Sequence, residues 1–460
     1  MNNSVSQTPD SIPAMFVKKT SSQLLRPLFI LFNKSIYTGQ VPKLWKKAIV
    51  IPIYKKGKVN DPKNYRPISL TSVICRILER IIHYYILTHS LNNQIISYAQ
   101  HGFITRRSTQ TQQILFFDQI TSMFEDKAQV EIVYLDFSKA FDKVSHPKLL
   151  HVLTHYKVDY KVTNWIRNYL ADRTQSTSVE SCISDSICVK SGVPQGSVLG
   201  PLLFVLFIDG LIKNICFHCK NTTVFAFADD IKLLSTEPRD IQRALDIVDS
   251  WTKNWGLQLN ADKSEHLTLR NNDPIPLYIG GKEIPSVNEV RDLGVIVSSD
   301  LHWSNYTRKI RAKANIISHL LLKTFTSNNP HLLINLYKTY VRPIVEYNTC
   351  TWSSGSRPVT KEVESVQKTY TRKVCQRGNV SFSSYEERLR ILDLESLEVR
   401  RKKRDLIFVY KIIYGLVDIE SLHYFNSLLL GVITSDDTNF TSTVSKQQTH
   451  PADEVSFQIE

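Results

Sequence analysis

Apolar and polar positions alternate with two different periods along the first 300 residues of this chain. A helical repeat of apolar residues runs from Ile12 to about Gly39, and a second one runs from about Thr71 to His89. Three short apolar runs, at Ala48–Tyr54, Gln129–Asp136 and Thr223–Phe227, have the length and composition of strands, and the first of them is predicted to be buried. The pattern therefore predicts a mixture of helices and strands.

Turn residues and further helical repeats fill the segments between these runs. Asp61–Leu70 is punctuated by proline and is predicted to be a loop. The other expected elements are helices near 147–155 and 159–171, a hairpin near 173–190, a glycine-rich loop at 191–200 and a helix from Pro201. Beyond Tyr306 the pattern is mostly helical. The last thirty residues are rich in Ser, Thr, Gln and Asp, which predicts a disordered tail.

The composition adds a charge argument to this mixed pattern. The 460 residues carry a formal net charge of +14, whereas the apolar share of 42% and the charged share of 22% are ordinary for a globular protein. Such a positive excess indicates an anionic polymer as the partner. The longest apolar runs, such as Leu202–Ile208 and Leu406–Tyr410, are far shorter than the about 20 residues of a membrane span, so no membrane partner is expected.

The N-terminus and the cysteines both indicate an intracellular protein. The first residues contain neither the charged nor the apolar segment of a secretory signal. The seven cysteines are scattered, as is usual in a reducing compartment. Cys216 and Cys219 have the spacing of half a zinc site, but no second ligand pair follows at zinc-finger spacing. We interpret this pair as part of a loop or a strand edge.

Three acidic residues stand at the ends of predicted strands. Asp229 and Asp230 lie between two short apolar runs, as the turn of a hairpin would, and Asp136 ends an earlier apolar run. Acidic pairs are common in turns for local reasons, because Asp tolerates turn geometry. Carboxylates on rigid strands also suit Mg²⁺, and two such ions about 4 Å apart can activate a hydroxyl and neutralise a leaving pyrophosphate. We therefore interpret Asp136, Asp229 and Asp230 as catalytic metal ligands of a templated polymerase.

Two further features fit a nucleotide site. Phe141 follows Asp136 by five positions, where a bulky ring would clash with a 2′-hydroxyl and select deoxynucleotides; a buried core phenylalanine is the alternative. The run Ser191–Pro201 contains three glycines, which allow close approach of the backbone to a ligand. Within this run Gln195, followed by Gly196, has an amide that can bond the edge of a template or nucleotide base.

Cationic residues precede the acids in the chain. Arg66, Arg76 and the segment Gln100–Thr109 supply guanidinium and hydroxyl groups. Arginines can hold a triphosphate through two parallel hydrogen bonds. Solvated surface charge is the alternative reading of each of them, so these residues are candidates for nucleotide binding and no more.

Taken together, these motifs resemble the reverse transcriptases of non-LTR retrotransposons, the LINE-like elements of the jockey type, which are similar to group II intron enzymes. The resemblance rests on Phe-Ala-Asp-Asp at 227–230, Leu-Asp-Phe-Ser-Lys-Ala-Phe-Asp at 135–142 and Ser-Gly-Val-Pro-Gln-Gly-Ser at 191–197. Leu259–Ser264 and Arg291–Val295 resemble later elements of that family. The similarity runs from about residue 10 to roughly residue 420, and several ordered motifs at matching spacing make it specific.

The resemblance implies an α+β fold shaped as a right hand, with fingers, a palm that contains an antiparallel sheet, and a helical thumb. The implied divisions are an N-terminal helical extension at 1–39, the reverse transcriptase fingers and palm at 40–300, a basic helical thumb and C-terminal region at 301–425, and the disordered tail at 426–460. The resemblance also implies that Phe137 and Lys263 lie at the nucleotide. Two Mg²⁺ ions, or Mn²⁺ in their place, are the implied cofactors.

The expected thumb is strongly basic. Between Arg308 and Arg377 there are thirteen Lys and Arg residues and three acids. Such a surplus beside a palm predicts sequence-independent contacts with nucleic-acid phosphates, and an ordinary solvated helix face is the alternative. The proposed phosphate contacts are Lys309, Arg311, Lys313, Lys338, Arg342, Arg372 and Lys373. The run Arg400–Arg404 fits a nuclear import signal and an RNA-facing helix equally well, and a functional protein is expected in the nucleus.

The predicted function is that of an RNA-directed DNA polymerase, which extends a DNA primer with dNTPs on an RNA template. Elements of this kind usually carry an endonuclease before the polymerase, so that activity is expected to be absent from this chain. Two alternatives stay open: a catalytically silent remnant of an element that only binds nucleic acid, and an RNA-dependent RNA polymerase. Phe141 argues against the second, because ribonucleotide polymerases must accommodate the 2′-hydroxyl.

Overall fold

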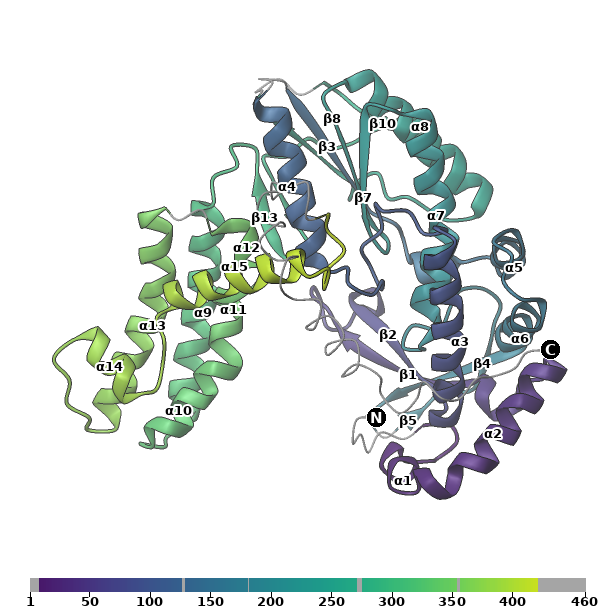
Figure 1. Ribbon diagram of the computed structural model, residues 1–460, viewed down its shortest axis with the longest axis horizontal. Helices are drawn as coiled ribbons and strands as arrows, with labels where there is room; N and C mark the ends of the chain where they lie inside the picture. Colours follow the sequence, from purple (N-terminus) through teal and green to yellow (C-terminus); the bar gives the residue numbers. More distant parts are fainter. Residues whose placement is uncertain (1–7, 126–128, 181, 271–274, 354–355, 421–460) are drawn as a thin grey trace, which may run out of the picture.

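The chain folds into one part built around β-sheets and one part built of helices (Figure 1). The computed structural model describes residues 8–420, except 126–128, 181, 271–274 and 354–355. Within this described portion the strands lie between Lys47 and Ser298, and helices follow from Ser304 to Ile413. The mixed α+β class predicted from the sequence is confirmed. The predicted disordered tail, residues 426–460, lies outside the described residues.

A four-stranded antiparallel sheet lies at the centre of the first part. In spatial order its strands are β7 (Thr222–Phe227), β8 (Asp230–Ser235), β3 (Val130–Leu135) and β9 (Glu265–Leu269). Helices α7 (Leu199–His218) and α8 (Pro238–Trp255) pack on one face, and α4 (Thr109–Glu125) packs on the other (Figure 1). Side chains alternate along β3, so Val133 and Leu135 join the core with α7 and α8, whereas Val130 and Ile132 join the cluster under α4.

A second sheet contains the strands that come earliest in the chain. In spatial order they are β2 (Tyr65–Leu70), β1 (Lys47–Tyr54), β4 (Arg173–Val179) and β5 (Cys182–Ile183), and β6 (Ile187–Val189) also pairs with β4. The prediction of a loop over Asp61–Leu70 is wrong in its second half, because Pro67 lies in β2 opposite Pro52. β2 is an edge strand, where a residue without an N–H is tolerated. The predicted burial of β1 holds only for its first half.

Two helices, and not one, occupy the segment predicted to be helical from Ile12 to Gly39. They are α1 (Ala14–Lys19) and α2 (Ser21–Thr38), separated by Thr20. Gly39 ends α2 with a left-handed φ of 69°, which glycine adopts without a Cβ clash. Three other predicted helices are confirmed as α3 (Val73–Asn92), α5 (His146–His155) and α6 (Tyr160–Leu170). Short 3-10 turns complete this part: η1 (Lys43–Lys46), η2 (Pro62–Asn64) and η3 (Ala140–Lys143).

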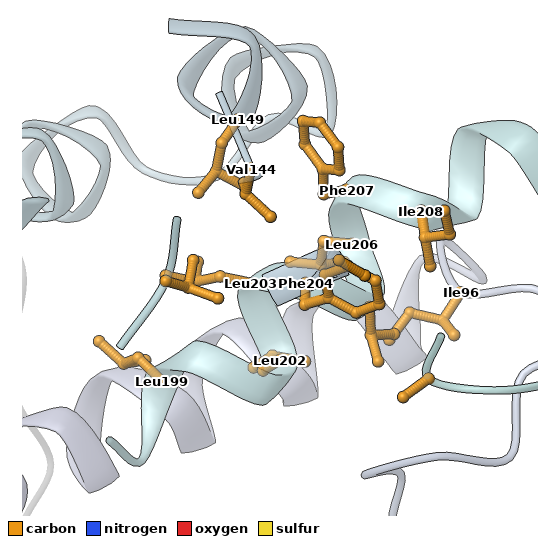
Figure 2. Close-up of a cluster of buried hydrophobic side chains, with 14 of the residues drawn as sticks. Ile96, Val144, Leu149, Leu199, Leu202, Leu203, Phe204, Leu206, Phe207 and Ile208 are labelled. Atoms are coloured by element: carbon orange, nitrogen blue, oxygen red, sulfur yellow. The ribbon is translucent and has the colours of Figure 1, made fainter. Parts of the chain in front are cut away.

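Helix α7 forms the centre of the core, and its side chains point into apolar neighbours on all sides (Figure 2). Within the described residues, α7 is long and apolar enough to cross a membrane by length and composition, which the short apolar runs of the sequence did not indicate. Isolated polar residues such as Asp209 and Lys213 interrupt those runs without making the helix polar. Most of α7 is buried, in contact with α3, α5 and α8. Cys216 lies in the last turn of α7, so its assignment to a loop or strand edge is wrong, whereas Cys219 directly follows the helix in the connection to β7.

Two short hairpins lead from the sheets to the helical part. They are β10 (Tyr278–Ile279) with β11 (Lys282–Glu283), and β12 (Glu289–Asp292) with β13 (Val295–Ser298). The helices that follow are α9 (Ser304–Thr324), α10 (Pro330–Leu336), the π-helical turn η4 (Tyr337–Val341), α11 (Arg342–Glu346), α12 (Thr349–Trp352), α13 (Arg357–Arg377), α14 (Tyr385–Ile391) and α15 (Leu397–Ile413). Pro343 has no N–H to donate to the preceding turn, which accounts for the wider π geometry before it.

The helical part has a core of its own and contacts α4 through both α12 and α15. Its core contains the fully buried rings of Tyr337, Trp352 and Tyr370. Of these two helices, α15 crosses in front of the other helices and reaches α4 (Figure 1). Phe408 and Ile412 of α15 pack there against residues of α4. The helical part is therefore fixed to the sheets at both of its ends.

Candidate active site

The catalytic candidates lie at one edge of the four-stranded sheet. β3 and β8 are antiparallel neighbours, and Leu135 pairs with Ile231. Asp136 therefore follows β3 at the same edge at which Asp230 begins β8. Asp136 and Asp230 line one cavity of about 160 Å³. Asp229 stands immediately before Asp230, in the turn that joins β7 to β8.

This turn contains two residues and one unusual backbone conformation. Phe227 pairs with Asp230, which leaves Ala228 and Asp229 to make the connection. Ala228 has a φ of 59°, in the left-handed region. Two-residue hairpin turns use such positive φ values, which cost a residue with a Cβ about 1–2 kcal/mol relative to its usual conformation. The turn that presents Asp229 is thus held in a conformation that alanine alone does not favour.

Burial and mutual repulsion raise the pKa values of these carboxyl groups. For Asp230 burial is the largest cause, and with the neighbouring charges of Asp229, Asp292 and Asp136 it raises the pKa to about 6. Burial likewise raises the pKa of Asp136 and that of Asp229. Asp230 is still reached by solvent, so the pKa is raised by the protein atoms packed around the carboxyl group and not by complete enclosure. Like charges this close repel one another, and a divalent cation between them would relieve that repulsion.

Basic residues offset part of this repulsion. Against the effect of burial, Lys263 and then Lys55 lower the pKa of Asp136, and Lys263 lines the same cavity. Arg66, in β2, acts in the same way on Asp229. The structure therefore brings Lys263 and Arg66 of the predicted nucleotide residues towards the acids. Arg76 lies half-buried in α3, and no ion pair involves it within the described residues.

The segment Leu259–Ser264 holds the backbone of Asp136 from both sides. The Asp136 N–H donates to Ser264 Oγ over 3.2 Å, and the Asn260 N–H donates to the Asp136 carbonyl over 2.9 Å. Ser264 is completely buried. The sequence motif at these positions was recognised, but the support that it gives to Asp136 was not predicted. Asp136 and Ser264 are 128 residues apart, so no local pattern reveals their contact.

A buried ion pair lies beside the acids and was also missed from the sequence. Lys232 of β8 bonds Asp292 of β12, and their side chains are 3% and 6% exposed. The Lys232 ammonium lies 3.6 Å from the centre of the Phe116 ring, and Gln113 donates to the Asp292 carbonyl over 2.7 Å. Both charges line the cavity that contains Asp230. The pair ties β8 to the hairpin that leads into the helical part, and a lysine within the apolar run Ile231–Leu234 is the sequence signal that could have indicated it.

Phe141 lies in η3, five residues after Asp136, and packs against α7. Its ring stacks on Phe204 with centroids 4.3 Å apart, and the ring of Phe103 meets it edge-on at 6.5 Å. Phe141 is only partly buried, so one side of the ring stays available to a ligand. Phe137, the other aromatic residue predicted at the nucleotide, is 7% exposed and belongs to the core. A side-chain contact between Phe137 and a nucleotide is therefore less direct than the sequence suggested.

The glycine-rich loop packs closely against the second sheet. Gly196 has a φ of 114°, and a Cβ there would lie 2.5 Å from the Ser69 carbonyl oxygen, so no other residue fits without a shift. The Ser69 N–H donates to the Gln195 carbonyl over 2.7 Å. The Gln195 amide donates to Asp142 over 2.9 Å beside a cavity of about 120 Å³. This bond fixes the orientation of the Gln195 amide and occupies one of its two N–H donors.

The three catalytic candidates adjoin one another without forming a closed set of metal ligands. Among the residues that the structure describes, no three His, Cys, Asp or Glu side chains are grouped closely enough to hold an ion. Mg²⁺ commonly takes only one or two protein carboxylates and keeps water and substrate phosphates as its other ligands. An open edge with carboxylates from two strands is compatible with that kind of site.

Comparison with known families identifies the family to which this chain belongs. Residues 53–297, more than half of the chain, match the family described as "Reverse transcriptase (RNA-dependent DNA polymerase)". The chain belongs to this reverse transcriptase family. The matched range contains the strand ends that carry Asp136, Asp229 and Asp230, the glycine-rich loop and most of both sheets.

This reverse transcriptase is related to enzymes of insect retrotransposons. It is 28% identical to "Probable RNA-directed DNA polymerase from transposon X-element" of Drosophila melanogaster, over 77% of this chain and 40% of that protein. It is 26% identical to "RNA-directed DNA polymerase from mobile element jockey" of the same fly, over 78% of this chain and 41% of that protein. The resemblance to jockey-type elements is thus confirmed, and the chain spans about two fifths of the length of these relatives. An apo telomerase structure from Candida tropicalis is 12% identical, covers 80% of this chain and 66% of its own, and has a TM-score of 0.43.

Among the described residues of the helical part, some basic side chains are already bonded to other residues of the chain, and others are not. Four of the seven predicted phosphate contacts already have partners: Lys309 with Glu289 at 2.6 Å, Arg311 with Glu362 at 3.3 Å, Arg342 with Glu346 at 3.8 Å, and Lys338 with the Asp393 carbonyl at 3.4 Å. Lys313, Arg372 and Lys373 are exposed, and none of them has an ion pair in the described portion of the chain. These three are the stronger candidates for contact with phosphates.

Neutralising these three charges is expected to weaken binding of an RNA–DNA duplex about equally for every sequence. Each neutralised phosphate contact contributes about 0.7–0.9 to the slope of log K against log salt concentration, so Lys313→Gln, Arg372→Gln and Lys373→Gln together should flatten the slope by about 2–3. Fluorescence anisotropy at several salt concentrations measures both effects.

The matched control removes three exposed lysines from the opposite end of the protein. Lys18, Lys19 and Lys34 lie on α1 and α2 and are exposed. Their replacement by Gln changes the net charge by the same amount and should leave the slope nearly unchanged. Equal slopes for the two triple variants would show that the charges of α9 and α13 are solvated surface and not phosphate contacts.

The basic run Arg400–Arg404 is largely engaged inside the protein. Arg400 and Arg404 both bond the buried Glu346, and Arg401 is only 4% exposed. Its two lysines, Lys402 and Lys403, form surface ion pairs with Glu398 and Glu395. The hypotheses of an import signal and of an RNA-facing helix both stay predictions, and in this packing the two lysines are the most exposed residues of the run.

Proposed function

We propose that this reverse transcriptase extends a DNA primer with dNTPs on an RNA template. The observation that carries the proposal is the pairing of β3 with β8, which places Asp136 beside Asp230 and the Asp229 turn at one open edge. Carboxylates at a rigid sheet edge suit phosphoryl transfer, in which catalysis is mainly positioning and charge stabilisation. In this proposal the fingers extend over about 40–125, the palm reaches about 300 and the thumb follows, with residues 1–39 as an extension.

The residues at this edge fit two Mg²⁺ ions, with Mn²⁺ as a substitute. Hard oxygen ligands are present, and the pKa of Asp230, raised to about 6 by burial and by adjacent acids, marks repulsion that divalent cations would relieve. Asp136, Asp229 and Asp230 would hold the ions. When bound, the ions would activate the primer 3′-hydroxyl and neutralise the leaving pyrophosphate.

Other residues of the chain would bind and orient the nucleotide. Lys263 and Arg66 lie where their charges act on the acids, so they are placed to attract a triphosphate to the same edge. Phe141, partly buried and five residues after Asp136, would exclude a 2′-hydroxyl. Gln195, whose amide is oriented by Asp142, would bond a base with its remaining N–H or its carbonyl oxygen. The free charges of α9 and α13 would hold the duplex by its phosphates.

Binding of Mg²⁺ by this site is expected to weaken below about pH 6. Asp230 has a pKa of about 6 in the folded protein against an ordinary value of 3.8, so a proton competes with the ion in this range. The same raised pKa means that the folded protein holds a proton that the unfolded chain releases, and stability of the metal-free protein therefore falls as pH rises from about 4 to 6. Asp230→Asn should remove this loss and stabilise the metal-free protein at pH 7. Thermal unfolding from pH 4 to 8, with and without Mg²⁺, measures both effects.

Primer extension by the purified chain tests the function. The assay contains an RNA template, an annealed DNA primer, dNTPs and Mg²⁺, and runs in parallel with rNTPs in place of dNTPs. Extension with dNTPs supports the proposal, and extension with rNTPs alone would instead identify an RNA-dependent RNA polymerase. Binding of the duplex without extension in either arm would identify a remnant that binds nucleic acid but does not copy it.

A further inference from the structure

The segment from Ser97 to Arg107 lies directly against the hairpin of β7 and β8, which carries Asp229 and Asp230 at its turn. It runs beside β7, where the His101 N–H donates to the Ala226 carbonyl and the Ala226 N–H donates to the Ala99 carbonyl, both over 2.8 Å. These bonds make Gln100 the neighbour of Ala226 in a short parallel bridge. The sequence pattern of this segment suggested cations for a triphosphate, but its closest contacts are with the backbone of the hairpin.

The Gln100 side chain continues this contact into the turn itself. Gln100 is completely buried. Its Oε1 accepts two backbone N–H groups, those of Gly102 and Ala228, each over 2.8 Å, and its Nε2 lies 3.5 Å from the Ala228 carbonyl oxygen. One carboxamide therefore faces both the N–H and the carbonyl of the residue directly before Asp229.

The backbone at Gly102 and the turn at Ala228 are packed too closely to admit a side chain between them. A Cβ at Gly102 would lie 2.5 Å from the Ala228 backbone nitrogen. Ala228 itself has the left-handed φ of 59° that an alanine adopts only when its surroundings hold it. A buried N–H that lost the Gln100 acceptor would cost about 1–3 kcal/mol unless the turn moved to reach another partner. Movement of the turn is therefore the expected response to loss of Gln100.

Arg107 fixes the same segment from the other side and connects it to the C-terminal end of the helical part. Its Nη1 donates to the carbonyls of Ser97 and Gln100, each over 2.8 Å. Its Nε donates to Asp418 over 2.6 Å, and the Arg107 side chain is 4% exposed. The Asp418 N–H also donates to the Arg106 carbonyl over 3.0 Å. Residues beyond α15 thus return to hold the segment that holds the catalytic turn.

We propose that Gln100 is a positioning residue for the reaction: Arg107 and Asp418 hold the backbone of Gln100, and its carboxamide fixes the Ala228 turn and so sets the direction of the Asp229 carboxylate. The proposal rests on the proposed function, in which Asp229 is a ligand of the catalytic ion. It also assigns a role in the palm to Asp418, which follows the last helix of the chain's helical part. Outer residues that orient metal ligands typically contribute about 10–100-fold to metal affinity or activity.

The experiment compares Gln100→Met with Gln367→Met in the full chain. Gln367 is also completely buried; its amide donates to Tyr385 and Glu395 and accepts a bond from Tyr337, all within the core of the helical part. Both variants remove one buried amide of the same size, so both should lower the melting temperature. Only Gln100→Met should raise the Mg²⁺ concentration that gives half-maximal primer extension, by about 10-fold or more.

Two readouts do not depend on activity. Hydrogen exchange of peptides that cover residues 222–235 should become faster in Gln100→Met and stay unchanged in Gln367→Met. The Mg²⁺ concentration that gives half of the thermal stabilisation should shift upward in Gln100→Met alone. An inactive wild-type chain would overturn the proposed polymerase function, whereas hairpin exchange and Mg²⁺ binding would still report on Gln100.

A surface variant guards against the case in which Gln100→Met does not fold. Asp418 is 40% exposed at its side chain, so Asp418→Ala removes the partner of Arg107 without opening the core. This variant should speed exchange over residues 97–107 and raise the Mg²⁺ requirement by about 2–10-fold, less than Gln100→Met because it acts through Arg107. Wild-type exchange of the hairpin and a wild-type Mg²⁺ requirement in both Asp418→Ala and Gln100→Met would overturn the proposal.

Discussion

Primer extension is expected to fall by at least about 10³-fold, or about 4 kcal/mol of transition-state stabilisation, when Asp229 is replaced by Asn. The amide keeps the size of the carboxyl group and removes the negative charge that a Mg²⁺ ion would need. The turn does not depend on the charge, because Ala228 is held by Gln100 and the strand pairing on either side is made by the backbone. The variant should therefore fold and bind an RNA–DNA duplex as the wild type does. Single-turnover extension with saturating duplex and dNTPs measures the chemical loss apart from binding.

Asp249→Asn is the matched control for this prediction. Asp249 lies on α8 in a surface ion pair with Lys253 at 2.6 Å, so the substitution makes the same chemical change away from the catalytic edge. It should leave extension within about 2-fold of the wild type, because surface ion pairs contribute little. Retention of most activity in Asp229→Asn would contradict the assignment of Asp229 as a metal ligand, and equal losses in both variants would indicate damage to the fold.

The ratio of ribonucleotide to deoxynucleotide incorporation is expected to rise by about 10–100-fold when Phe141 is replaced by Val. The ring stacks on Phe204, which fixes its plane, and it is only partly buried. Loss of a ring that excludes a single hydroxyl is worth at most about 100-fold in discrimination, because an apolar contact alone rejects one added hydroxyl only weakly. Steady-state incorporation of a single dNTP and the matching rNTP, each as kcat/KM, gives the ratio directly.

The stacking on Phe204 makes a purely structural role for Phe141 a serious alternative, so the control removes a ring from the same core. Phe207 lies on α7 and packs against Trp251 and Trp255, with ring centroids 6.0 and 5.3 Å away. Phe207→Leu should lower the melting temperature without changing the ratio. If Phe141→Val still extends primers and its ratio also stays at the wild-type value, Phe141 is core packing and its argument against an RNA-dependent RNA polymerase is lost.

The two predictions separate the alternatives that the family relationship leaves open. Membership of the reverse transcriptase family does not tell whether this chain is active, because it spans about two fifths of the length of its curated relatives. A loss in Asp229→Asn requires activity in the wild type, which a silent remnant does not have. A shift in Phe141→Val requires a preference for dNTPs, which an RNA-copying RNA polymerase does not have.

The sequence by itself determined the elements whose pattern is local. The acids were found because apolar strands end abruptly at Asp136 and at the Asp229–Asp230 pair, and a strand that ends in a turn is visible within ten residues. The confirmed helices α3, α5 and α6 follow from apolar repeats of the same short range. The wrong predictions arose where a residue's local preference was overridden by its position in the folded protein. Pro67 marks a loop by composition, but it lies at a sheet edge, where its missing N–H has no partner to lose.

Only the tertiary structure decided how the acids are held. Gln100 reaches Ala228 across 128 residues, and Arg107 reaches Asp418 across 311. Lys232 meets Asp292 across 60 residues, inside an apolar strand where burial of an unpaired charge would be prohibitive. None of these side chains differs in type from an ordinary surface residue, and each acquires its role only from the partner that folding brings to it. A hydrogen bond acts over about 3 Å, so its partners are set by the packing of the sheets and not by distance along the chain.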